Sequence, residues 1–162
     1  MGTRTEGRGS TPALYTPEQR KRRDETRWTL VQGVLAPLQF VVFLVSLALV
    51  FRYLMTGEGY MIATASIVIK TGVLYTIMVT GAIWEKVVFD QYLLAPAFYW
   101  EDMFSFAVIA LHTLYILALF TGALSASALI ALALLAYAVY VVNAAQFLLK
   151  LRQARLQTEV AV

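Results

Sequence analysis

Four long runs of apolar residues dominate this 162-residue sequence. They cover residues 29–55, 60–84, 103–121 and 125–149. As an α-helix with a rise of about 1.5 Å per residue, each run is long enough to cross the roughly 30 Å hydrocarbon layer of a membrane. Hydrophobic residues make up 60% of the chain and charged residues only 14%, which excludes an ordinary soluble domain. We therefore expect an all-α integral membrane protein with four transmembrane helices.

The basic residues lie mainly at one side of these expected spans. Ten of the thirteen Lys and Arg residues fall before the first span or after the fourth, and Lys86 lies in the connection between the second and third. Only Arg52 is near the opposite side. Because cytoplasmic loops of membrane proteins are enriched in Lys and Arg, both termini and this connection are predicted to be cytoplasmic. The short connections on the other side predict two antiparallel hairpins.

Three parts follow from this pattern. Residues 1–28 are predicted to form a cytoplasmic tail, residues 29–149 the membrane domain, and residues 150–162 a second cytoplasmic tail. A short polar helix is expected in the first tail, where Thr16 and Gln19 form the pattern of a capping box. The net charge of +3 is explained by this topology, so no nucleic-acid partner is expected. Cysteine is absent, which excludes disulfides and Cys-bound metals.

The cytoplasmic connection over residues 85–102 has an unusual composition. It carries four of the ten acidic residues, namely Glu85, Asp90, Glu101 and Asp102. Aromatic residues accompany them: Trp84, Tyr92, Phe98, Tyr99 and Trp100. Such a stretch suits a flat, partly apolar ligand. Two plainer interpretations are acidic residues stabilised at a helix N-terminus and aromatic residues in an ordinary membrane-interface belt.

Polar residues within the spans gather toward the cytoplasmic side. Helical spacing puts Glu101, Ser105 and His112 on one face of the third span. The other spans contribute Gln32, Gln39, Thr71, Tyr75, Asn143, Gln146 and Lys150. Since polar side chains in a membrane tend to face the bundle interior or a wet cavity, these residues predict a pocket that opens to the cytoplasm. Interhelical hydrogen bonding is the alternative role for the Gln and Asn residues.

Two ionisable residues, Lys70 and His112, are expected near the middle of the membrane at the same depth. They are therefore able to face each other. As the only histidine, His112 excludes haem held by two histidines of one chain. Three roles stay open for it: a ligand to the central metal of a pigment, a proton carrier, or a buried histidine with satisfied hydrogen bonds.

Several longer strings resemble the vinyl bacteriochlorophyllide hydratase family. They are Y-T-P-E-Q-R-K-R-R-D (15–24), W-T-L-V-Q-G-V-L-A-P-L-Q-F (28–40), Y-T-I-M-V-T-G-A-I-W-E-K-V-V-F (75–89), L-A-P-A-F-Y-W-E-D-M-F-S-F (94–106) and N-A-A-Q-F-L-L-K-L-R (143–152). The resemblance covers about residues 14–156. It implies a lyase of bacteriochlorophyll synthesis in the bacterial inner (intracytoplasmic) membrane. This enzyme adds water to the C3-vinyl group of chlorophyllide a, or of a related bacteriochlorophyllide, and forms a 1-hydroxyethyl group.

The chemistry of this hydration needs an acid and a base. A carboxyl group beside apolar surface can stay protonated near neutral pH, as a general acid requires. We expect Glu101 or Asp102 to be the acid and Glu85 to hold or deprotonate the water. No cofactor is expected, because the only metal is the magnesium of the pigment.

The remaining candidates would bind the pigment. His112 is expected over the magnesium, with Gln39 or Asn143 as a water-mediated alternative. Stacking on the ring is assigned to Trp84, Phe98, Tyr99 and Trp100, and further contacts to Lys70, Tyr75 and Gln146. The propionate of the pigment is expected near Lys86, Lys150 or Arg152.

Two other functions fit the same residues. A non-catalytic protein that binds chlorophyllides and transfers them between enzymes would need the same pocket. A haem-binding membrane anchor of an oxidoreductase has only His112 to offer. Besides the pigment and the lipid bilayer, a second copy of the chain and other enzymes of pigment synthesis are candidate partners.

Overall fold

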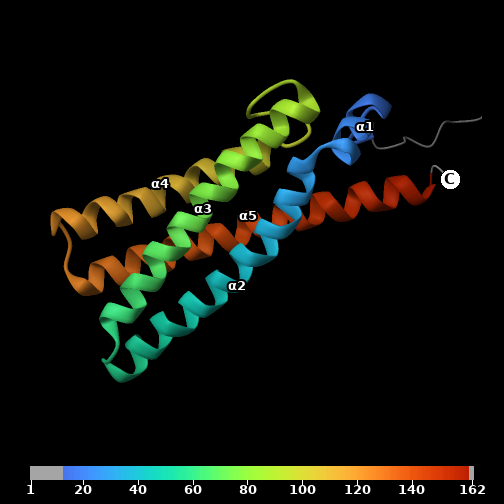
Figure 1. Cartoon of the computed structure of the whole chain (residues 1–162). Coiled ribbons are helices and arrows are strands. Elements are labelled where there is room, and N and C mark those ends of the chain that lie inside the picture. The colour runs from blue at the N-terminus through green and yellow to red at the C-terminus, as the bar shows by residue number, and fades with distance from the viewer. Residues whose placement is uncertain (1–12, 161–162) are drawn as a thin grey trace, which may run out of the picture.

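The computed structural model describes residues 13–160, and all regular elements in this part of the chain are α-helices (Figure 1). A short helix, α1 (Pro17–Glu25), precedes four long ones: α2 (Arg27–Thr56), α3 (Tyr60–Phe89), α4 (Tyr99–Thr121) and α5 (Ala126–Val160). Each long helix contains a stretch that is long and apolar enough to cross a membrane. The expected all-α class with four candidate spans is therefore confirmed.

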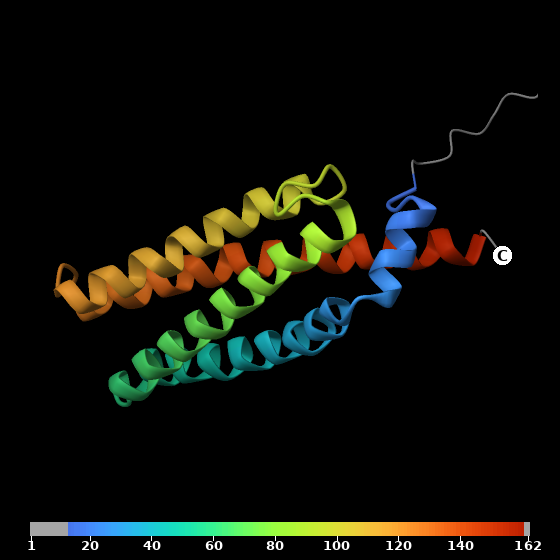
Figure 2. The same cartoon turned by 45° about the horizontal axis from the view of Figure 1, so that its top comes forward.

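The four long helices lie in two pairs. Helix α2 lies alongside α3, and α4 lies alongside α5 (Figures 1 and 2). The tight turns α2–α3 and α4–α5 are at one end of the bundle. The opposite end, called the α1 end below, carries α1, the connection 90–98 and the last turns of α5 (Figure 2). Residues that are far apart in sequence therefore meet at the α1 end.

Local sequence signals explain where several helices begin and end. The Thr16 hydroxyl accepts a hydrogen bond from the Gln19 N–H, and the Gln19 side chain accepts one from the Thr16 N–H, so the predicted capping box is present. Gly57 (φ 72°) ends α2, and Gly122 (φ 64°) ends α4, each in the left-handed conformation that glycine adopts without steric cost.

The helices extend further at the α1 end than expected. Helix α3 continues through Trp84 and Glu85 to Phe89, and α4 already starts at Tyr99, so the irregular connection is 90–98 and not 85–102. Helix α5 runs on to Val160, where the sequence analysis expected a tail from residue 150. Continuing the helix satisfies backbone N–H and C=O groups that would otherwise need other partners at a membrane surface. The division into one membrane domain and two tails stays a prediction, and residues 1–12 lie outside the described part.

Large apolar side chains cover the outer surface, and small residues of α5 pack inside. Leu30, Met55 and Phe120 are 71%, 80% and 78% exposed, which is typical of a surface that faces lipid. Helix α5 has the largest buried share of the four spans, and its Ala133 and Ala136 are each 1% exposed. Small residues at these positions let neighbouring helices approach closely.

The packing of α5 gives a stability prediction. Replacing Ala136 by Leu should lower the free energy of unfolding by about 1–3 kcal/mol, because the larger side chain has no space in the packed interior. Replacing the exposed Ala138 by Leu is the matched control and should leave stability unchanged. Thermal unfolding in detergent micelles, followed by circular dichroism, measures both. Equal unfolding midpoints for the two variants would contradict this packing.

Candidate active site

Two buried carboxyl groups meet at the α1 end, where α3 ends and α4 begins. Glu85 is 5% exposed and Asp102 is 4% exposed. Their carboxyl groups lie within hydrogen-bonding reach of each other. We call Glu85 and Asp102 the carboxyl pair. Because like charges in contact repel, the pair is most stable when it holds one shared proton.

The connection 90–98 wraps over the carboxyl pair and donates backbone hydrogen bonds to it. The Leu94 N–H donates to Asp102 Oδ2 at 2.7 Å, and the Ala95 N–H donates to Glu85 Oε2 at 3.4 Å. To reach this position, Leu94 takes a left-handed conformation with φ 60°, which is unusual for a residue other than glycine. Together these contacts fix the orientation of both carboxyl groups.

Glu101 does not join the carboxyl pair, although it is adjacent to Asp102 in sequence. Its Oε1 lies 3.4 Å from Lys150 Nζ on α5, and its Oε2 has no hydrogen-bond partner among the described residues. Successive residues of a helix point about 100° apart, so Glu101 and Asp102 face different neighbours. The expected grouping of Glu101 with Asp102 on one side of the substrate, opposite Glu85, is therefore not the arrangement in the structure.

A small polar network links α4 to α5 behind Glu101. The Asn143 side-chain amide donates to the Glu101 carbonyl oxygen at 2.8 Å, and the Ser105 hydroxyl donates to the same carbonyl at 2.8 Å. Ser105 Oγ also lies 3.2 Å from Asn143 Oδ1. These bonds give Asn143 the interhelical role that the sequence analysis kept as an alternative.

Aromatic side chains pack into a cluster beside the carboxyl pair. Phe98 is 3% exposed, and its ring contacts those of Trp84, Phe89 and Phe147 with centroid separations of 5.6, 5.8 and 6.1 Å. Trp84 also donates from Nε1 to Thr29 Oγ1 at 2.9 Å. Tyr99 and Trp100 lie outside this cluster and are 44% and 67% exposed. Of the four predicted stacking residues, only Trp84 and Phe98 therefore belong to this cluster, whereas Tyr99 and Trp100 contact each other at 5.5 Å.

Lys70 and His112 face each other in the middle of the bundle, as their predicted depth suggested. Lys70 Nζ lies 2.8 Å from His112 Nε2, and His112 Nδ1 lies 2.8 Å from the Val108 carbonyl oxygen. The carbonyl fixes the proton on Nδ1, so Nε2 accepts from the lysine. Lys70 is fully buried, and its Nζ lies 4.1 Å from the centre of the Tyr140 ring, in the geometry of a cation–π contact. Both ring nitrogens of His112 are therefore engaged within the protein.

The other predicted binding residues are dispersed. Tyr75 is 36% exposed and its hydroxyl bonds to Thr113 at 2.6 Å on the outer surface. Lys86 Nζ donates to the carboxylate and the carbonyl oxygen of Asp90 at 2.8 and 2.9 Å, and this hydrogen bond lowers the pKa of the Asp90 carboxyl. Gln39 is 2% exposed and neither polar atom of its amide has a partner among the described residues; the same holds for Gln146 Oε1. The polar residues of the four spans thus make their contacts in separate groups within the part of the chain that the structure describes.

A cleft of about 610 Å³ lies at the α1 end, at a place that was not predicted from the sequence. Three segments form it: the residues before and within α1, the connection 90–98, and the last turns of α5. Its lining is Ala13, Leu14, Gln19, Phe89, Pro96, Ala97, Lys150, Gln153, Leu156 and Gln157. The spacing of Lys150, Gln153 and Gln157 puts them on one face of a helix, and this pattern could have indicated the cleft. It was not used because residues 150–162 were predicted to be a tail.

The N-terminal segment is held against this cleft by specific contacts. The Leu14 N–H donates to Gln157 Oε1 at 2.9 Å. Tyr15 is 5% exposed, stacks on Phe89 at 5.8 Å, and carries the Arg23 guanidinium 4.8 Å above its ring. Residues before α1 therefore form a structural wall of the cleft and pack on the aromatic cluster.

Comparisons with known proteins agree with this chain along nearly its whole length. The sequence profile of the family described as 2-vinyl bacteriochlorophyllide hydratase (BCHF) matches residues 15–153. A protein named 2-vinyl bacteriochlorophyllide hydratase from Cereibacter sphaeroides is 71% identical over 148 residues, which are 91% of this chain and 92% of the relative. A protein of the same name from Rhodobacter capsulatus is 70% identical over 148 residues, 91% of this chain and 86% of the relative.

No solved structure has a significant match to the chain. The profile match spans α1 to α4, the part of α5 up to residue 153, and every residue of the carboxyl pair and the aromatic cluster. The chain belongs to the 2-vinyl bacteriochlorophyllide hydratase family.

Proposed function

We propose that the protein is a hydro-lyase of bacteriochlorophyll synthesis that adds water to the vinyl group of a chlorophyllide or bacteriochlorophyllide. Family membership and identity of about 70% to two proteins named for this activity support the reaction. The buried carboxyl pair is the single structural observation that supports the site, because the reaction requires two linked proton transfers.

The proposed setting is the inner (intracytoplasmic) membrane of a photosynthetic bacterium. The chain would cross the membrane four times as two antiparallel hairpins, with the α1 end in the cytoplasm. The concentration of Lys and Arg before the first span and after the fourth supports this orientation. The carboxyl pair would then lie near the cytoplasmic membrane surface, where both water and a flat apolar pigment have access.

The reaction proceeds through a cation next to the pigment ring. A proton adds to the terminal CH2 of the vinyl group, and the electrons of the double bond form the new C–H bond. The positive charge on the carbon beside the ring is spread by conjugation with the macrocycle. Water attacks this carbon and loses one proton to a base, which leaves a 1-hydroxyethyl group. The sum is one alkene plus one water, so no electron acceptor, donor or separate cofactor is needed.

The carboxyl pair supplies both proton transfers in this proposal. Asp102 accepts the shorter backbone hydrogen bond, 2.7 Å against 3.4 Å, which favours the carboxylate form at Asp102. In a reversal of the roles expected from the sequence, Glu85 is then the neutral acid that protonates the vinyl group, and Asp102 takes the proton from water. The proton taken by Asp102 restores the single proton of the pair after each turnover. Negative charge beside the site also stabilises the developing cation.

Singly replacing Glu85 by Gln and Asp102 by Asn tests the acid–base role. Each substitution keeps the shape of the side chain but removes its proton transfer, so hydration should fall by at least about 100-fold while pigment binding remains. Asp90→Asn is the control, because Asp90 is an exposed carboxylate of the same connection. The measurement is incorporation of heavy oxygen from labelled water into the pigment, with binding followed by pigment fluorescence.

The outcomes of this experiment separate the two functions. Full activity in both carboxyl variants would contradict the role of the carboxyl pair. If the unchanged protein binds the pigment but introduces no labelled oxygen, it is a pigment carrier and not a hydratase.

The Lys70–His112 pair joins α3 to α4 in the membrane interior, and we propose a structural role for this link. Ligation of the pigment's magnesium by His112 would first require Lys70 to release Nε2. His112→Ala should therefore lower thermal stability, because it leaves the buried Lys70 amine without its hydrogen-bond acceptor. It should not change the ratio of affinities for a magnesium pigment and the same pigment without magnesium. Selective loss of affinity for the magnesium pigment would instead identify His112 as its ligand.

A further inference from the structure

The cleft at the α1 end has an amphiphilic lining. Leu14, Phe89, Pro96 and Leu156 give it apolar walls, and the amides of three Gln residues lie among them. Lys150 is the one charged residue among the described residues that line it. A ligand that fits this lining has an apolar body and one anionic group.

The ammonium group of Lys150 has N–H donors that its contact with Glu101 does not use. Its distance of 3.4 Å from Glu101 Oε1 is longer than the roughly 2.7–2.9 Å of a strong charge-assisted hydrogen bond. An ammonium group has three N–H donors, and this loose ion pair engages at most one of them. Glu101 is 7% exposed, and its second oxygen has no partner among the described residues. Glu101 is thus the counter-ion of Lys150 within the protein. The remaining N–H donors of the ammonium group are available to a ligand in the cleft.

The cleft and the carboxyl pair share one short piece of backbone. Leu94 and Ala95 donate their N–H groups to Asp102 and Glu85, and the next two residues, Pro96 and Ala97, line the cleft. A ligand seated against Pro96 and Ala97 therefore contacts the same backbone segment that holds the carboxyl pair.

The substrate has the matching arrangement of groups. In a chlorophyllide, the ring that bears the vinyl group and the ring that bears the free propionate are neighbours in the macrocycle. We infer that the cleft binds the propionate-bearing edge of the pigment, and that Lys150 binds the propionate carboxylate and so directs the vinyl group toward the carboxyl pair. This inference rests on the proposed hydratase function and assigns a substrate-positioning residue to it.

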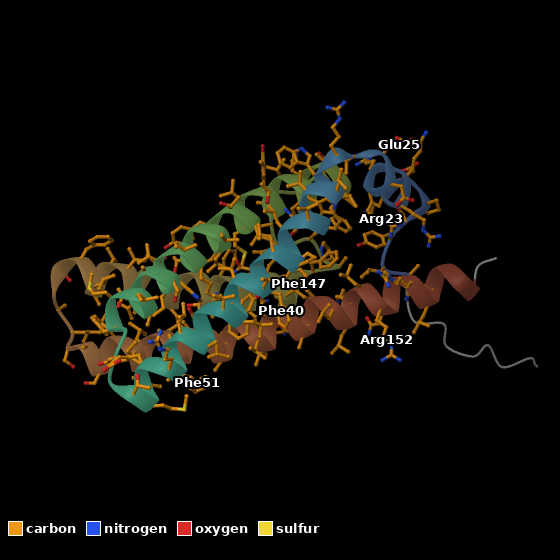
Figure 3. All side chains as sticks on the ribbon, turned by 60° about the horizontal axis from the view of Figure 1, so that its bottom comes forward. Arg23, Glu25, Phe40, Phe51, Phe147 and Arg152 are labelled. Atoms are coloured by element: carbon orange, nitrogen blue, oxygen red, sulfur yellow. The ribbon has the colours of Figure 1, made fainter. Side chains whose placement is uncertain are left out.

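The other two basic residues considered for the propionate are less suited. Lys86 is held by two hydrogen bonds to Asp90 and does not line the cleft. Arg152 is exposed, and Figure 3 shows its side chain extending from α5 away from the other helices. Lys150 is therefore the basic residue that both faces the cleft and lies close to the proposed site.

The experiment compares chlorophyllide a with its methyl ester, which keeps the ring and the vinyl group but lacks the negative charge. The unchanged protein should have a lower KM for the free acid than for the ester. Lys150→Gln should raise the KM for the free acid about tenfold. The KM for the ester divided by the KM for the free acid should then fall toward one. Lys150→Arg should retain the preference for the free acid. Arg152→Gln, which removes an exposed charge outside the cleft, is the matched control and should retain it too.

A further variant tests the role of Glu101. Glu101→Gln removes the internal partner of Lys150 and should tighten binding of the free acid but not of the ester, measured by fluorescence titration in detergent micelles. A merely structural Lys150–Glu101 link would instead lower the thermal stability of both variants and leave the acid-to-ester ratio unchanged.

The inference and the hydratase function fail in different ways. Equal KM values for acid and ester in the unchanged protein, or an unchanged ratio in Lys150→Gln, would overturn the role of Lys150 while hydration persists. An equal loss of preference in Arg152→Gln would also overturn it, because the effect would then arise from general surface charge. Absence of hydration of either pigment by the unchanged protein would overturn the proposed function itself.

Discussion

The hydrogen bonds from the Leu94 and Ala95 N–H groups to the carboxyl pair determine the form of the α1 end. Two carboxyl groups that are almost fully buried would be strongly unfavourable without such donors. Providing the donors forces the connection 90–98 back over the end of α3 and puts Leu94 in the left-handed region. The same path brings Phe98 into the aromatic cluster and places Pro96 and Ala97 on the wall of the cleft.

Specific hydrogen bonds join the two helix pairs in the interior, in addition to the apolar core that all four long helices share. Ser46 on α2 bonds to the Tyr137 hydroxyl on α5, and Lys70 on α3 bonds to His112 on α4. Lipid is as apolar as a leucine side chain, so burial of apolar surface alone discriminates poorly between contact with lipid and contact with another helix. Hydrogen bonds between specific side chains therefore give this bundle a defined register.

Much of the fold could be predicted from the sequence because its signals are local. Run lengths predict the four spans, the Thr16–Gln19 pattern predicts the start of α1, and counting residues along two helices places Lys70 opposite His112. The site was less predictable. Tyr75 faces outward, and Glu101 faces α5. Neither direction was predictable, because the faces of an apolar helix differ little in polarity. The rotation of such a helix about its axis is therefore determined by the helices that it contacts. The catalytic roles stay predictions, since neither the family resemblance nor the structure assigns them.

The cleft has walls from the two ends of the described chain. Leu14 and Gln157, which are joined by a hydrogen bond, are 143 positions apart. During synthesis, the spans up to α4 can enter the membrane before the last turns of α5 exist. The carboxyl pair can then already form, because α3 and α4 contain both of its residues. The cleft, in contrast, closes only once α5 has left the ribosome and its final turns have met the residues before α1. A nascent chain therefore lacks the complete cleft, which becomes available only to the finished protein.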